Sequence, residues 1–202
     1  MREFASIDPE TGEMLWYKGE EGDETTSDYN EAGKRYLGKA DPKLYGGFTN
    51  TFRLYDFDLS LQLNYSFGGK VYNSAARYDE NFNNFYGNTT EYIYDNMWRE
   101  PGDITMVPAP QQNALNSHSS FYLMDGSYIK LKSMQIGYNL PKTVISKMSL
   151  TNARVFVTGD NLATWALGDD FRGLDPEAES SGVIWWNYPV PRKVLFGLSL
   201  SF

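Results

Sequence analysis

FDLSLQLNYSF, residues 57–67, alternates apolar and polar side chains along its whole length. Phe57, Leu59, Leu61, Leu63, Tyr65 and Phe67 fall on one side of an extended chain, and Asp58, Ser60, Gln62, Asn64 and Ser66 on the other. This period of two predicts a β-strand with one apolar and one polar face.

The same alternation occurs at VLFGLSLSF, residues 194–202, and in weaker form elsewhere. We predict strands at about 44–55, 57–67, 127–140, 152–164 and 191–202. In the third strand Ile129 and Leu131 have the opposite phase to Met134 and Ile136, so we expect a β-bulge near Lys132 and Ser133. The sequence does not determine which way the strand at 152–164 faces.

The connections between successive strands alternate between short and long. In chain order they have a couple of residues, about sixty, roughly ten and about twenty-five. Outer-membrane barrels have this pattern, with short periplasmic turns and long extracellular loops. We therefore predict an all-β fold of antiparallel up-and-down strands that form the C-terminal segment of a large transmembrane β-barrel. Residues 1–43 are predicted to be an extracellular loop region, and residues 44–202 the barrel segment.

The long second connection is predicted to contain one short loop helix. Asn88 and Glu91 suit its start, and Ile93 with Met97, and Tyr94 with Trp98, would pair on its surface.

Composition excludes several functions. A net charge of −8 and a pI near 4.7 leave no basic face for nucleic acid. Because cysteine is absent, disulfides, thiolate zinc sites and a cysteine nucleophile are excluded. No apolar run approaches the roughly 20 residues of a spanning helix, and residues 1–20 lack the order of a signal peptide.

The apolar sides of the two most regular strands carry no Lys or Arg, and Arg53 falls on the opposite side. This fits a lipid-facing surface, where a basic residue costs roughly 2–4 kcal/mol at the bilayer midplane. Alternation alone fits an edge strand of a soluble sandwich equally well. The connection lengths favour the barrel.

Several stretches together resemble the carboxy-terminal part of the SusC/RagA-like TonB-dependent outer-membrane transporters. They are ASIDPETGEMLWY (5–17), YLGKADPKLYGGFTNTF (36–52), FDLSLQLNYSFGGKVYN (57–73), GSYIKLKSMQIGYNLP (126–141), RVFVTGDNLATW (154–165), GLDPE (173–177) and YPVPRKVLFGLSLSF (188–202). The resemblance covers nearly the whole chain in the family's order.

The resemblance implies an importer of glycan fragments or peptides in the outer membrane of Gram-negative bacteria, energised through TonB, with a SusD-like surface lipoprotein as lid. It also implies a plug and a large barrel. Nothing here matches the plug or the TonB-contacting segment, and five strands are too few to close a barrel. We therefore expect a segment of a larger transporter, with membrane lipid and the remaining barrel as partners.

Aromatic residues in the long loops are candidate contacts to substrate or partner: Trp98, Trp185, Trp186 and Tyr188. Packing within their own loops, or an aromatic girdle at the membrane boundary, is the favoured interpretation of these residues. Phe196, Leu198, Leu200 and Phe202 resemble the barrel-insertion signal of outer-membrane proteins.

No residue set predicts an enzyme, a cofactor or a metal site. Asp169, Asp170, Asp175 and Glu177 offer oxygen ligands, but they lack the spacing of a calcium loop and are interpreted as solvated carboxylates. The single histidine, His118, is interpreted as a polar loop residue. The alternative function is a secreted carbohydrate-binding β-sandwich module, which would share the aromatic residues and the acidity.

Overall fold

The computed structural model describes residues 1–82, 89–110, 114–168, 174–177 and 181–202. The chain divides into two compact units that interleave along the sequence. One comprises Met1–Ala40, Lys70–Met124 and Glu179–Asn187, and we call it the loop unit. The other comprises Asp41–Gly69, Asp125–Ala178 and Tyr188–Phe202, and we call it the sheet unit.

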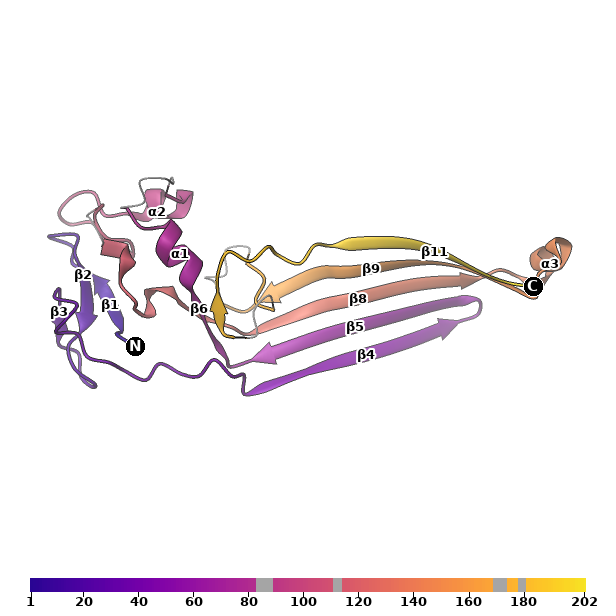
Figure 1. Cartoon of the computed structure of the whole chain (residues 1–202), viewed down its shortest axis with the longest axis horizontal. Helices are drawn as coiled ribbons and strands as arrows, with labels where there is room; N and C mark the ends of the chain where they lie inside the picture. The colour runs from indigo at the N-terminus through magenta and orange to yellow at the C-terminus, as the bar shows by residue number, and fades with distance from the viewer. Residues whose placement is uncertain (83–88, 111–113, 169–173, 178–180) are drawn as a thin grey trace. The chain divides into compact units, whose positions relative to one another are not determined.

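The sheet unit contains an antiparallel five-stranded sheet (Figure 1). Its strands are β4 (Leu44–Leu54), β5 (Phe57–Phe67), β8 (Tyr128–Asn139), β9 (Asn152–Ala166) and β11 (Lys193–Ser201). They lie side by side in the order β11-β9-β8-β5-β4, so each of the five pairs with its neighbour along the chain. This up-and-down arrangement confirms the predicted fold class.

The predicted bulge in β8 is confirmed. Gln62 of β5 pairs with Ser133, whereas the next residue, Leu63, pairs with Leu131, which leaves Lys132 as the extra residue. Without this insertion the side chains of one half of β8 would point to the wrong side of the sheet.

Of the two short connections, only the first is a tight turn. Tyr55 and Asp56 link β4 to β5, and Tyr55 adopts the left-handed conformation with φ 52°. Between β8 and β9 lie helix α3 (Lys142–Ile145) and the 3-10 turn η3 (Ser146–Met148), where the sequence suggested only a turn. Ile145 and Leu150 are buried there against Ala153, which forms a small core at this end of the sheet.

A glycine allows the last strand to pack against its neighbour. Gly197 of β11 lies opposite Phe156 of β9, and a Cβ added at Gly197 would overlap the Phe156 ring. The aromatic ring therefore occupies the space that a side chain at position 197 would need, so any larger residue would displace it.

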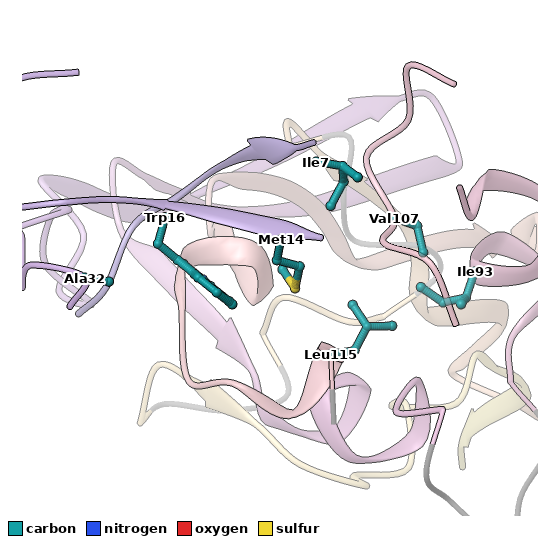
Figure 2. Close-up of a cluster of buried hydrophobic side chains, with 7 residues drawn as sticks. All are labelled: Ile7, Met14, Trp16, Ala32, Ile93, Val107 and Leu115. Atoms are coloured by element: carbon teal, nitrogen blue, oxygen red, sulfur yellow. The ribbon is translucent and has the colours of Figure 1, made fainter. Parts of the chain in front are cut away.

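The loop unit has a core of its own. Strands β1 (Phe4–Ile7), β2 (Met14–Tyr17) and β3 (Thr25–Thr26) form one small sheet, and β6 (Lys70–Asn73), β7 (Leu123–Asp125) and β10 (Val183–Ile184) another. One cluster of its buried apolar side chains, drawn in Figure 2, consists of Ile7, Met14, Trp16, Ala32, Ile93, Val107 and Leu115. Segments far apart in the sequence thus share one hydrophobic cluster.

Short helices and turns complete the loop unit: α1 (Ser74–Asp79), α2 (Glu91–Asn96), η1 (Ala114–Asn116) and η2 (Ser120–Tyr122). The sequence predicted one helix in the long second connection, whereas the structure has two, α1 and α2, between β5 and β8. None of the helices in the described ranges has the length and hydrophobicity to cross a membrane.

The predicted details of the loop helix are also corrected. The capping residue of α2 is Thr90, whose hydroxyl accepts the Ile93 N–H at 3.4 Å, and Asn88 lies outside the described residues. Because Trp98 donates its backbone N–H to Val107 at 3.0 Å, the chain leaves the helix before Met97. The predicted helical pairs with Met97 and Trp98 were wrong.

Candidate functional site

The face of the sheet that carries Asp58, Gln135 and Arg154 is the polar face. Arg154 donates from Nε and Nη2 to the Asp58 carboxylate at 3.1 and 2.6 Å, and Nη2 also donates to Gln135 at 3.2 Å. The Asp58 and Arg154 side chains are both partly buried. A forked, two-point contact of this kind is a strong form of ion pair, and it joins β5, β8 and β9 across the sheet.

Neutral polar side chains continue this network along the polar face. The Ser133 hydroxyl donates to Asp160 at 2.9 Å, and the Gln135 amide donates to Thr158 at 2.8 Å. These contacts link β8 to β9, whose facing is thereby determined. The result is a surface of hydroxyl, amide and charged groups suited to contact with water.

Residues 174–177, which we call the acidic strap, bind to the polar face. Lys130, only 1% exposed, places its Nζ 2.8 Å from both Asp175 and Glu177. Lys132 contacts Glu177 at the same distance, and Asn64 donates to Glu177 at 3.3 Å. Lys130 and Lys132 are two residues apart and therefore lie on the same side of β8, and the bulge keeps Ser133 and Gln135 of the following half on that side as well.

This cluster corrects the interpretation of the acidic residues. Asp175 and Glu177 are not solvated loop carboxylates, since their partners are the two strand lysines; Asp169 and Asp170 lie outside the described residues. Burial raises the pKa of Glu177, but hydrogen bonds from Lys130 and Lys132 outweigh it and leave the pKa below its ordinary value. Two lysines beside a predicted bulge were the only sequence signal for this contact.

A pocket of about 330 Å³ opens beside the acidic strap. Its lining comes from the strap, from β8 and β9, and from the segment before β11, and includes Lys130, Thr164, Asp175 and Arg192. Such a volume lies at the lower end of the range of small-molecule sites.

The opposite, apolar face of the sheet is exposed. A continuous row crosses it through paired residues: Phe52, Leu59, Ile136, Val157 and Phe196. Phe196 is 82% exposed, and Leu198, Leu200 and Phe202 are also exposed. Leu59 and Leu61 are only partly buried. A sandwich would bury these side chains beneath a second sheet, so the alternative of a soluble β-sandwich is not supported.

The loop unit carries an exposed cluster of three aromatic rings, Tyr78, Trp185 and Trp186. Their ring centroids are 5.7–6.1 Å apart. Parallel pairing of β10 with β6 (Val183 opposite Tyr72) places the residues after β10 beside α1, which follows β6. Tyr78, on α1, was not singled out from the sequence.

The other two predicted aromatic contacts behave differently. Trp98 is partly buried against the core of the loop unit, and its indole N–H donates to the Pro9 carbonyl at 3.0 Å. These contacts hold Trp98 within the loop unit, and a contact of Trp98 with substrate or partner stays a prediction. Tyr188 is 91% exposed and belongs to the sheet unit.

The rings of His118 and Tyr72 contact each other in the loop unit, with centroids 4.6 Å apart and planes tilted by 32°. Burial raises the pKa of Tyr72 to about 12, whereas burial and the nearby Arg77 lower the pKa of His118. In the part of the chain that the structure describes, no three His, Asp or Glu side chains gather as a metal site.

An antiparallel up-and-down sheet with one exposed apolar face and one hydrogen-bonded polar face defines a segment of a transmembrane β-barrel. No protein-family model matches the chain. The chain is 31% identical over 182 residues to TonB-dependent receptor P3 of Formosa agariphila and 30% identical over 182 residues to TonB-dependent receptor P26 of the same organism. The matches cover 85% and 82% of this chain but only 17% and 18% of those receptors.

Solved structures give the same result. The RagAB peptide transporter matches all of this chain with a TM-score of 0.84 and 28% identity, over 22% of that chain. RagAB in its closed-closed state matches with a TM-score of 0.85. The chain is thus a barrel segment of the SusC/RagA-like TonB-dependent receptors, which are proteins of the Gram-negative outer membrane.

Proposed function

We propose that this chain supplies barrel wall and extracellular loops to an outer-membrane importer of peptides or glycan fragments. The observation that carries the proposal is the match of the whole chain to RagAB, a peptide transporter. The polar face supports it, because side chains joined in a hydrogen-bonded network suit the wall of a water-filled passage. The proposed role is in transport, as in the RagAB peptide transporter, and no reaction is assigned to the chain.

The two edges of the sheet explain why the importer needs further strands. Within the described residues β4 and β11 each pair with a strand on one side only. Backbone groups left unpaired in lipid cost several kcal/mol each, so these edges need neighbours from the rest of the barrel. The proposed complete assembly adds those strands, a plug energised through TonB, and a SusD-like surface lipoprotein.

The loops and the last strand have proposed roles in this assembly. Trp185, Trp186 and Tyr188 are exposed and therefore available to substrate or to the lipoprotein. Residues 196–202 are proposed to serve as the barrel-insertion signal, for which the exposed apolar side chains of Phe196 and Phe202 are suited.

Uptake by living cells tests the proposal. A bacterium that encodes this chain is grown with peptides or glycan oligomers as its only nitrogen or carbon source, with and without the gene of the complete receptor. We expect loss of growth and of labelled-substrate uptake on one substrate class, with recovery when the gene is restored. Unchanged uptake of both classes in the deletion strain would refute the proposal.

A further inference from the structure

The three rings of Tyr78, Trp185 and Trp186 form an aromatic platform on the loop unit. Tyr78 and Trp185 are stacked with an interplanar angle of 24°, and Trp186 is tilted by 41° from Tyr78. The residues are 41%, 44% and 63% exposed, respectively. Rings that contact one another but stay half exposed leave ring surface open to a ligand.

Polar contacts hold this platform in place. The indole N–H of Trp186 donates to both carboxylate oxygens of Asp79, at 3.0 and 2.8 Å. The Arg77 guanidinium lies 4.5 Å from the centre of the Tyr78 ring. Asn73 caps α1 by accepting the Ala76 N–H at 2.9 Å, which stabilises the helix that carries Arg77, Tyr78 and Asp79. A ligand therefore meets rings whose rotation is already restricted, so less entropy is lost on binding.

The size of the platform distinguishes a small ligand from a protein partner. A large aromatic side chain has roughly 150–250 Å² of surface. With about half of it exposed, three of them offer on the order of 300 Å², whereas a standard protein interface buries about 800 Å² on each partner. The exposed area of the platform is enough to contact one or two sugar rings, but it is too small to bind a lipoprotein by itself.

The groups around the platform suit a neutral sugar. The C–H face of a pyranose ring packs on an aromatic ring, and its hydroxyls need hydrogen-bonding partners at the ring edge. Asp79 provides carboxylate oxygens with lone pairs beyond the Trp186 contact, and Arg77 provides N–H donors. The net charge of −8 disfavours a polyanionic glycan.

We infer that the platform of Tyr78, Trp185 and Trp186, edged by Asp79 and Arg77, is a binding site for a neutral glycan. The inference rests on the proposed import function and narrows its substrate class. Trp185 and Trp186 hold the sugar by stacking, and Asp79 is a positioning residue that fixes the Trp186 ring.

Binding to the purified complete receptor tests the site. The probes are cellohexaose, mannohexaose and xylohexaose as neutral glycans, with hexagalacturonate as the anionic one, and dissociation constants are measured by calorimetry. We expect the wild-type receptor to bind at least one neutral probe, and W186L or W185L to weaken that binding about tenfold or more, as loss of a stacking aromatic does for nucleic-acid bases. D79A is expected to weaken binding less, and D79N, which still accepts the indole N–H, to restore most of it.

The control is W165L in β9, because Trp165 is also about half exposed (51%) but lies on the sheet. It should leave glycan binding unchanged. Three results would overturn the inference. W185L and W186L could bind the glycan as tightly as wild type, or these variants could co-purify with less surface lipoprotein while their glycan binding is unchanged. The third result is that wild type binds no neutral probe. The last result would leave the proposed function intact if labelled peptides were still imported.

Discussion

The acidic strap offers a sharp prediction about Lys130. Replacing it by Met removes a cation that is 1% exposed and lies 2.8 Å from two carboxylates. Loss of one partner from a buried ion pair costs about 3–5 kcal/mol. We expect the lower end, about 3 kcal/mol, because Glu177 keeps Lys132 as a partner.

Hydrogen exchange at the strap measures this loss directly. The Glu177 amide donates to Asp175 at 3.1 Å, so its exchange reports opening of the strap. A loss of about 3 kcal/mol corresponds to exchange roughly a hundredfold faster in the complete K130M receptor.

The matched control is K132M, because Lys132 contacts the same Glu177 but is 37% exposed. Exposed pairs contribute about 0–1 kcal/mol, so exchange should rise less than about fivefold. Equal rates in K130M and K132M would show that burial does not make Lys130 the main anchor of the strap.

Three further predictions concern the two faces of the sheet and two titrating groups. L61R, on the apolar face, should lower the free energy of unfolding of the barrel by about 2–4 kcal/mol, measured by chemical unfolding from lipid vesicles. Q62R, on the polar face, should have little effect. Similar decreases in both variants would contradict a lipid-facing apolar side. The pKa of Glu177 is lowered in the folded state, so ionised Glu177 should stabilise the bound strap fully above the ordinary value of 4.5. This stabilisation should be lost as pH falls through the lowered pKa. If hydrogen exchange of the strap has the same acid dependence in E177Q as in wild type, Glu177 is not its source. Because the pKa of Tyr72 is raised from 10.0 to about 12, the folded state should lose stability as pH rises across that interval. In Y72F, alkaline unfolding curves should lack this decrease, and the corresponding phenolate absorbance should be absent. An unchanged unfolding curve in Y72F would exclude Tyr72 as the source of the decrease.

Local periodicity explains why so much of the sheet could be predicted. Alternation along residues 57–67 depends only on the geometry of an extended chain, and the phase change after Leu131 already implied a bulge. Both features are properties of neighbouring residues. The facing of β9 and the early end of α2 could not be predicted, because contacts with Gln135 and Val107 from other segments decide them.

The sequence by itself determined a five-stranded, two-faced antiparallel segment and its resemblance to an outer-membrane receptor family, since both follow from patterns within short stretches. Only the tertiary structure paired Lys130 with Asp175 and placed Trp186 beside Asp79. These partners are 45 and 107 residues apart along the chain. Ion pairs and ring contacts depend on distance in space, which chain folding sets and local periodicity does not record.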